Sequence, residues 1–273
     1  MSLTKADGAN IYYEILGQGG DPLVLIQGYG HHSLHWGALP DEFVKIGYQV
    51  VLLDNRGVGR SDKPEAPVTI PMMADDVCKV MDAAGIGRAS IFGVSMGGMI
   101  AQVFALNHAD RLINLILGCT FPGGQNQVQS GPEAAKILSD YEYLKNMTPE
   151  QRSMTVFKFF CSEEFIQENP EAFKYYHQVT TEYPTPTFTF KRQAEAILKE
   201  DTWDRLPGIK APTMIITGTA DRIVPFKNSE LLEERIPGAE LVLLQDKLHG
   251  FFIEAMDSTR IFVNGFMKRK AKK

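Results

Sequence analysis

Residues 89–102 read ASIFGVSMGGMIAQ and contain, in this order, the signs of a strand, a sharp turn and a helix. The apolar run Ala89–Val94 has the length and the continuity of a strand that is buried on both faces. Glycines on both sides of Ser95 allow a turn that larger side chains would block. The next segment, Met96–Asn107, is expected to be a buried helix. This order predicts that Ser95 lies at the end of a central strand.

Similar apolar runs of strand length recur along the chain, separated by stretches of helical periodicity. The expected strands are Ile11–Leu16, Leu23–Gln27, Gln49–Asp54, Ala89–Val94, Leu112–Leu117, Thr213–Thr217 and Glu240–Leu244. The expected helices are Trp36–Ile46, Ile70–Ala84, Met96–Asn107, Asn228–Arg235 and Phe251–Met267. Alternating strands and helices predict an α/β fold with a mostly parallel, doubly wound sheet.

The alternation stops between residues 121 and 206, where aromatic side chains are frequent. Flexible segments rich in glycine or proline bound this region at Phe121–Asn126 and Pro207–Pro212. We therefore expect a core domain made of residues 1–120 and 207–273. Residues 121–206 are expected to form a helical cap, or lid, over one end of the sheet.

Composition excludes several classes of protein. The 273 residues are 44% hydrophobic, which suffices for a large core, and 28 basic against 33 acidic residues give a net charge of −5. Such a chain has no overall positive field to attract nucleic acid. The most apolar stretch, Ile91–Leu106, is too short and too rich in glycine for a membrane span. The expected partner is a small-molecule substrate, with no nucleic acid and no membrane; the oligomeric state stays open.

The start of the chain and its cysteines bear on localisation. Residues 1–10 lack the charged start and apolar core of a signal peptide. The three cysteines Cys78, Cys119 and Cys161 have no C-x-x-C spacing and an odd number, which favours free thiols in a reducing compartment. A cytoplasmic location is therefore expected.

Ser95 is the candidate nucleophile. The segment Gly93–Gly97 matches the pattern G-x-S-x-G, in the strand–turn–helix context that this pattern requires. One alternative is a glycine-rich turn whose serine has no chemical role. The other is a phosphate cradle, which is disfavoured because the Walker spacing and its lysine are missing.

A serine nucleophile needs a base and a carboxylate that orients the base. His249 is the candidate base because it follows the last expected strand, and loops after parallel strands meet at one edge of the sheet. Asp221 follows the preceding strand and is the candidate carboxylate; its rival is Asp246. His108 lies at the far end of the helix that begins after Ser95, and His177 lies within the aromatic region.

Two backbone N–H groups are expected to stabilise negative charge on a reacting carbonyl oxygen. Met96 directly follows the nucleophile at the start of a helix, where N–H groups are free. Tyr29, in the loop Gln27–Gly30, is the candidate for the second donor. The alternative interpretation of this loop is a plain glycine turn.

Two further groups of residues carry side chains that could react or bind a metal. His31, His32 and His35 lack a nearby carboxylate or cysteine that would complete a metal site, so a pocket rim or a solvated loop is favoured. Cys119 is not in a glycine-flanked turn like the one at Ser95 and is expected to pack in the interior. The sequence thus predicts no metal and no cofactor.

Taken together, the elbow Gly93–Gly98, the turn Asp54–Ser61, the segment Gly218–Pro225 and the pair His249-Gly250 resemble the α/β-hydrolase superfamily. The resemblance implies a catalytic triad of Ser95, Asp221 and His249, with Met96 and Tyr29 as oxyanion-hole donors. It also implies that the region between the central strands and the strand before Asp221 is a lid. The elbow is similar to that of the branch containing 3-oxoadipate enol-lactonases and non-metal haloperoxidase-like esterases.

Three positions bear on the branch. Gln27 stands where many members have histidine. Ser95 argues against the haloalkane dehalogenase and epoxide hydrolase branches, whose nucleophile is a carboxylate. Gly250 stands where carbon–carbon bond hydrolases of ring-cleavage pathways usually carry an aromatic residue, which disfavours that branch.

The expected activity is hydrolysis of a carboxylic ester, lactone or thioester through an acyl group on Ser95. Clustered aromatic residues in the expected cap indicate a mainly apolar substrate portion. Two alternatives remain: a carbon–carbon bond hydrolase with the same triad, and a ligand-binding protein without hydrolytic activity on the same fold.

Overall fold

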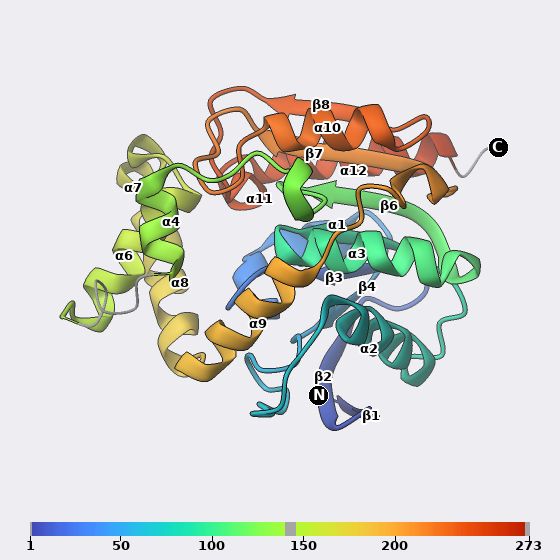
Figure 1. The fold of residues 1–273 in the computed structure, drawn as a ribbon, viewed down its shortest axis with the longest axis horizontal. Helices are drawn as coiled ribbons and strands as arrows, with labels where there is room; N and C mark the ends of the chain where they lie inside the picture. Colours follow the sequence, from blue (N-terminus) through green and yellow to red (C-terminus); the bar gives the residue numbers. More distant parts are fainter. Residues whose placement is uncertain (1, 140–145, 271–273) are drawn as a thin grey trace.

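In the computed structural model, which describes residues 2–139 and 146–270, one sheet of eight strands forms the centre (Figure 1). The strands lie in the order β1-β2-β4-β3-β5-β6-β7-β8. Their bounds are β1 (Ser2–Ala6), β2 (Ala9–Leu16), β3 (Pro22–Ile26), β4 (Gln49–Leu53), β5 (Ala89–Val94), β6 (Leu112–Gly118), β7 (Thr213–Gly218) and β8 (Glu240–Leu244). From β4 to β8 every neighbouring pair is parallel, which confirms the predicted mostly parallel sheet.

At the antiparallel edge of the sheet the apolar pattern predicted the strand Ile11–Leu16, which lies within β2, but not β1 or the antiparallel pairing. Strand β1 pairs with β2 in an antiparallel hairpin, and β2 pairs antiparallel with β4. Three of the five residues of β1 are exposed, so it lacks the continuous apolar run that reveals a buried strand. The hairpin extends the sheet without changing the position of Ser95.

Helices cover both faces of the sheet (Figure 1). One face packs against α2 (Ile70–Ala83), α3 (Met96–Asn107) and α10 (Lys227–Arg235), and the other against α1 (Leu39–Lys45) and α12 (Met256–Lys270). Each face has its own cluster of buried apolar side chains, as a doubly wound sheet requires. Within the described ranges, none of the helices combines the length and the apolar character of a membrane span.

Two expected helices are interrupted. In place of one helix over Trp36–Ile46, the chain forms the 3₁₀ turn η1 (Ser33–Trp36) and then α1, because Gly37 adopts a left-handed conformation with φ of 59°. The expected helix Phe251–Met267 is divided into α11 (Phe251–Glu254) and α12 at Ala255, whose φ of −124° leaves the helical region. Further single 3₁₀ turns are η2 (Ala109–Arg111), η3 (Gly124–Asn126) and η4 (Leu206–Gly208).

Between β6 and β7 the chain forms a helical insertion. Its described helices are α4 (Pro132–Ser139), α6 (Pro149–Phe160), α7 (Glu163–Glu168), α8 (Pro170–Glu182) and α9 (Thr187–Lys199). Helix α6 begins with a proline after the capping side chain of Thr148, and α7 begins after the capping side chain of Ser162. The insertion lies beyond the carboxyl ends of the parallel strands (Figure 1). It therefore faces the end of β5 at which Ser95 lies.

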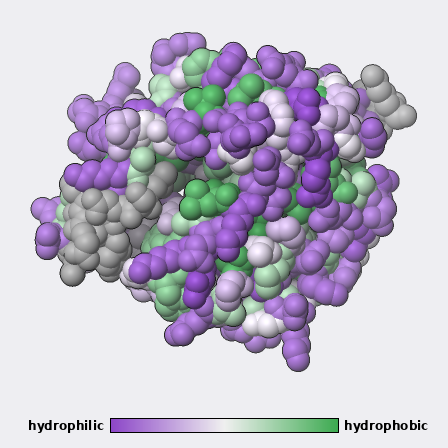
Figure 2. Space-filling model, viewed as in Figure 1, coloured by the Kyte–Doolittle hydropathy of each residue, from purple (hydrophilic) through white to green (hydrophobic). Residues whose placement is uncertain are grey.

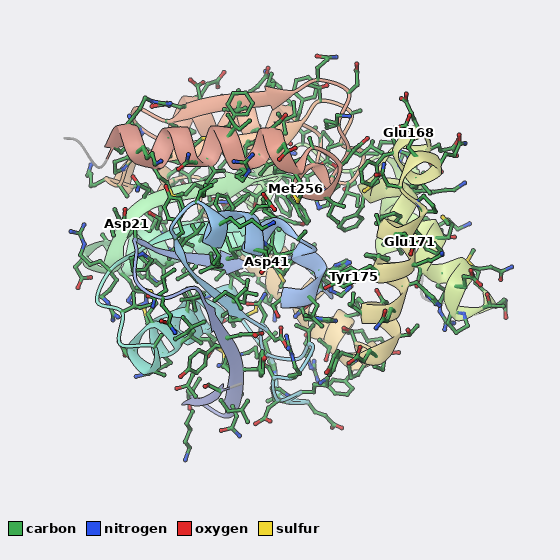
Figure 3. The ribbon with its side chains drawn as sticks, turned by 180° about the vertical axis from the view of Figure 1, so that it is seen from behind. Asp21, Asp41, Glu168, Glu171, Tyr175 and Met256 are labelled. Carbon is green, nitrogen blue, oxygen red and sulfur yellow. The ribbon has the colours of Figure 1, made fainter. Side chains whose placement is uncertain are left out.

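On the far side of the molecule, α8 contacts the segment before α1. Figure 3 shows Tyr175 on the side of α8 that faces this segment, whereas Glu168 and Glu171 lie toward the outside. The Tyr175 hydroxyl donates to the Leu34 carbonyl at 3.1 Å. This hydrogen bond holds the insertion to the loop after β3, in addition to the two chain connections that join the insertion to the core.

Candidate functional site

Ser95 occupies the sharp turn between β5 and α3 in a backbone conformation that is rare for a residue with a side chain. Its φ is 55° and its ψ is −124°. The turn is compact because a Cβ at Gly93 would lie 2.1 Å from the Gly97 carbonyl oxygen, and a Cβ at Gly97 would lie 2.2 Å from the Ile26 carbonyl oxygen. Only glycine fits at these two positions. The Ser95 side chain consequently stands at the strand end and lines a cavity.

His249 and Asp221 form a buried hydrogen-bonded pair. His249 Nδ1 lies 2.7 Å from Asp221 Oδ2, and the two side chains are 4% and 0% exposed. The other carboxylate oxygen, Oδ1, accepts the backbone N–H groups of Ile223 and Val224 at 2.8 and 2.9 Å. These backbone donors fix the carboxylate, and the carboxylate in turn fixes the plane of the imidazole ring.

Electrostatics favour a proton on this imidazole. Burial by itself would lower the pKa of His249, but the negative charge of Asp221 and its hydrogen bond outweigh burial and raise that pKa well above its ordinary value. The ring is therefore a strong proton acceptor through Nε2. A base of this kind is what a serine hydroxyl needs for activation.

Ser95 and His249 line the same cavity, but no hydrogen bond joins their side chains within the described ranges. His249 Nε2 instead lies 4.0 Å from Cys119 Sγ. Catalytic hydrogen bonds are often long in a site without substrate and shorten when the substrate binds. The structure thus brings the serine and the imidazole to one cavity wall, with Asp221 behind the imidazole.

Cys119 is a neighbour of the imidazole that sequence reasoning missed. It directly follows β6, is fully buried and has a φ of 38°. Burial raises the pKa of its thiol, so the group is neutral at neutral pH. Its place after the strand next to β5 was a usable signal, because such positions lie at the same edge of the sheet as Ser95.

The loop after β3 passes directly over Ser95. A Cβ at Gly28 would lie 2.9 Å from Ser95 Cβ, so the loop backbone is in contact with the nucleophile candidate. Gln27 supports this loop: its Oε1 accepts the Gly28 N–H at 3.1 Å, and its carbonyl accepts from Asn55 at 2.9 Å. Tyr29 lines the cavity from the same loop. Met96, at the first position of α3, has an N–H without an acceptor inside the helix.

The cavity beside Ser95 has a volume of about 700 Å³ and lies between the insertion and the carboxyl ends of the strands. Figure 2 shows a hollow with hydrophobic residues on this face of the molecule. The apolar lining residues are Val94, Ala134, Ile137, Pro149, Val156, Phe159, Phe160, Pro184, Phe190, Ala194, Ile223 and Phe252. A cavity of this size and lining suits a small organic substrate with an apolar portion.

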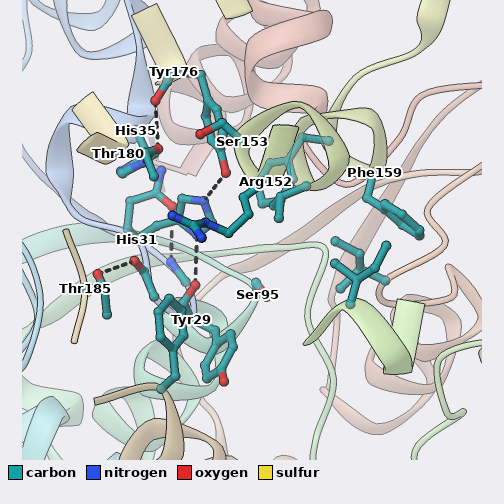
Figure 4. Close-up of a pocket in the computed structure, with 18 of the residues that line it drawn as sticks. Tyr29, His31, His35, Ser95, Arg152, Ser153, Phe159, Tyr176, Thr180 and Thr185 are labelled. Carbon is teal, nitrogen blue, oxygen red and sulfur yellow. Dashed lines mark hydrogen bonds between the residues drawn. The ribbon is translucent and has the colours of Figure 1, made fainter. Parts of the chain in front are cut away.

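The three neighbouring histidines lie inside the protein, so the interpretation as a solvated loop was wrong and that as a pocket rim fits better. His31 and His35 line the cavity, and His32 is fully buried. The His31 ring lies between two oxygen atoms: Nδ1 is 2.8 Å from the Tyr29 carbonyl oxygen, and Nε2 is 3.1 Å from the Tyr176 hydroxyl (Figure 4). Burial lowers the pKa of His31 to about 4, so this ring is neutral near pH 7.

The remaining sequence candidates have other surroundings. His108 Nε2 lies 2.8 Å from Asp75 Oδ1, and His177 Nδ1 lies 3.0 Å from the Ser153 hydroxyl oxygen. Asp246 has a φ of 58° and accepts from the neighbouring Gln245 side chain. Neither these histidines nor Asp246 is among the residues that line the cavity beside Ser95.

Comparisons with known proteins bear on the fold and the family. The sequence family described as alpha/beta hydrolase fold matches residues 21–255. A putative carbamate hydrolase, RutD, of Azorhizobium caulinodans is 29% identical over 97% of this chain and 98% of its own. A 2-hydroxy-6-oxononadienedioate/2-hydroxy-6-oxononatrienedioate hydrolase of Burkholderia vietnamiensis is 30% identical over 85% of this chain and 81% of its own.

Among solved structures, the enol-lactonase from Burkholderia xenovorans LB400 superposes with a TM-score of 0.83 at 26% identity, covering 98% of this chain and 100% of that chain. The sheet order, the elbow at Ser95 and the match of residues 21–255 all point to one family. The chain therefore belongs to the α/β-hydrolase fold family and is a hydrolase.

Proposed function

We propose that the protein hydrolyses a carboxylic ester, lactone or thioester with a mainly apolar portion, through an acyl group carried by Ser95. The observation that carries the proposal is the buried His249–Asp221 pair, at 2.7 Å, beside the cavity into which the elbow presents Ser95. The enol-lactonase similarity supports this reaction class. We also propose that residues 121–206 act as the lid of this cavity.

In the proposed reaction, Ser95 Oγ attacks the substrate carbonyl carbon and its proton passes to His249 Nε2. The Asp221 carboxylate stabilises the imidazolium that forms. The N–H groups of Met96 and Tyr29 would donate to the carbonyl oxygen as it becomes negative. His249 then protonates the leaving oxygen or sulfur, and a water molecule activated by His249 releases the acid.

The direct test replaces the nucleophile. Ser95→Ala is expected to lower kcat on short p-nitrophenyl esters by about a thousandfold or more, because the acyl-enzyme no longer forms. A fluorophosphonate probe should label the wild type and leave Ser95→Ala unlabelled. Ester hydrolysis within a few-fold of the wild type in the variant would contradict the assignment.

Carbon–carbon bond hydrolysis is the second candidate, because the relative from Burkholderia vietnamiensis is named for a substrate of that kind. The surroundings of position 250 support the ester reaction instead. A Cβ on Gly250 would lie 2.8 Å from the Phe160 carbonyl oxygen and 2.9 Å from Phe160 Cβ, so an aromatic side chain there has no room. Turnover of ring-fission dienoates much faster than that of esters would select the second candidate.

A further inference from the structure

The cavity beside Ser95 has an uneven distribution of charge. Apart from His249, which pairs with Asp221, the charged lining residues that the structure describes are Arg152 of α6 and Lys191 of α9, and none of the described lining residues is an aspartate or glutamate. The whole chain has the opposite balance, with a net charge of −5. A cleft lined by one sign of charge attracts small ions of the other sign.

Arg152 is held in place by a hydrogen bond, and no carboxylate of the described residues neutralises it. Its side chain is partly buried, and one guanidinium N–H donates to the Met147 carbonyl at 3.1 Å. No ion pair joins it to a carboxylate in the described part of the chain. Lys158 on the same helix differs, because it faces outward and lies 3.2 Å from Glu163. Figure 4 shows Arg152 directed from α6 toward the side of the cavity where Tyr29 and His31 lie.

An unpaired charge that is partly removed from water is costly, and a bound anion would compensate the cost. Guanidinium has five N–H donors in a planar fork that matches a carboxylate, and the Met147 carbonyl uses only part of this capacity. A single negative charge neutralises the half-buried Arg152, which favours a carboxylate as the ligand over a doubly charged phosphate.

On α6, the helical repeat places Arg152 at one end of a row of apolar side chains that line the cavity. Arg152, Val156, Phe159 and Phe160 line the cavity from successive turns of α6. On α9, Lys191 is exposed and lines the cavity together with Phe190 and Ala194. A ligand that fills the space would therefore have an apolar middle and a charged end.

We propose that the substrate is an ester or lactone whose acyl portion ends in a carboxylate, and that Arg152 pairs with this carboxylate. Lys191 adds attraction at the exposed part of the wall. The proposal rests on the proposed function, because Ser95 defines the reacting end of the substrate. Arg152 would thus select the substrate without touching the reacting atoms.

Binding without turnover tests the proposal first. The Ser95→Ala variant is titrated calorimetrically with monomethyl esters of the dicarboxylic acids from succinic to suberic acid, and with methyl esters of the matching monocarboxylic acids. At one chain length the acid-bearing ester is expected to bind at least about tenfold more tightly than its neutral partner. Adding Arg152→Gln should abolish this preference. The matched control Lys158→Gln, with the same loss of charge on the same helix, should retain it.

Kinetics with Ser95 present supply the second readout. Arg152→Gln is expected to raise KM for the acid-bearing ester about tenfold more than KM for the neutral ester, and to be partly rescued by Arg152→Lys. Equal affinity for charged and neutral esters at every length would overturn the proposal, as would an equal loss with Lys158→Gln. Absence of any ester hydrolysis by the wild type would contradict the proposed function instead, while the binding arm still decides on Arg152.

Discussion

At the scale of single residues, the candidate site contains two side chains that are held in unusual states. Ser95 has a positive φ of 55°, and His249 has a pKa raised well above its ordinary value although it is buried. Both states are maintained by neighbours: the glycine turn confines Ser95, and Asp221 offsets the burial of His249. Strain of this kind is commonly retained where function needs it.

The strained backbone of Ser95 predicts a gain in stability when the side chain is removed. Ser95→Gly should have a free energy of unfolding about 1 kcal/mol or more above that of Ser95→Ala, because glycine tolerates the positive φ and alanine does not. Urea denaturation measures the difference. The matched pair Ser90→Gly and Ser90→Ala, at a position of strand β5 without a positive φ, should show the opposite order.

The raised pKa of His249 predicts the pH profile. The proposed reaction needs a neutral imidazole, so kcat/KM should fall as the pH decreases through the His249 pKa, and this acid limb should lie above pH ~6.5. Asp221→Asn removes the charge that raises the pKa and leaves the burial that lowers it. The acid limb should then move to lower pH, and kcat should drop by about a thousandfold or more. An unmoved limb would show that another group titrates.

At the scale of elements, the close contact of α3 with β3 and β5 positions the elbow. Gly97 is the point of closest approach, since any Cβ there meets the Ile26 backbone. The sharp turn and the close packing of α3 therefore both require glycine, and the pattern G-x-S-x-G supplies it at both positions.

Substituting this glycine should be strongly destabilising. Gly97→Ala is expected to cost about 3 kcal/mol or more in the free energy of unfolding, because the new Cβ would meet backbone atoms of Ile26, which no change of rotamer can move away. Gly265→Ala on α12 is the control: its Cβ would meet nothing closer than the end of Arg269, at 3.6 Å, and a gain of about 0.5–1 kcal/mol is expected. Chemical denaturation of both variants compares them. A small loss at Gly97 would mean that α3 shifts freely.

At the scale of the whole molecule, α9 ties the insertion to the loops that surround Ser95. The fully buried Gln193 accepts the Gly30 N–H at 2.9 Å through Oε1 and donates to the Arg56 carbonyl at 3.4 Å. Thr189 and Thr185 donate to the carbonyls of Gly57 and Gly30 at 3.1 and 2.9 Å. Through these bonds, movement of the insertion would be felt in the loop over Ser95.

Loss of the Gln193 side chain should loosen this attachment. Gln193→Ala is expected to destabilise the protein by about 2 kcal/mol, because it leaves buried backbone groups without their partner. Hydrogen exchange should increase first in α9 and in the loop that contains Gly30. The control Glu195→Ala, on the exposed side of α9, should leave exchange in that loop unchanged. Equal exchange in both variants would exclude a structural link through Gln193.

Much of the architecture could be predicted because buried parallel strands leave a strong local signal. The helix Met96–Asn107 and the strands Ala89–Val94 and Glu240–Leu244 have the predicted bounds. The polar edge strand Ser2–Ala6 was missed because its pairing with β2, not its own hydrophobicity, makes it a strand. Gly37 likewise divided a region whose periodicity alone predicted one helix.

The sequence by itself determined the elbow, the succession of strands along the chain and the set of candidate residues at one sheet edge, because these depend on local turns and apolar runs. Only the tertiary structure decided that Asp221 rather than Asp246 faces His249, that Cys119 lies against the imidazole, and that Arg152 lines the cavity without a carboxylate partner in the described chain. Such contacts join residues far apart in sequence. Their distances follow from how the insertion and the strand ends pack, and no local pattern records that packing.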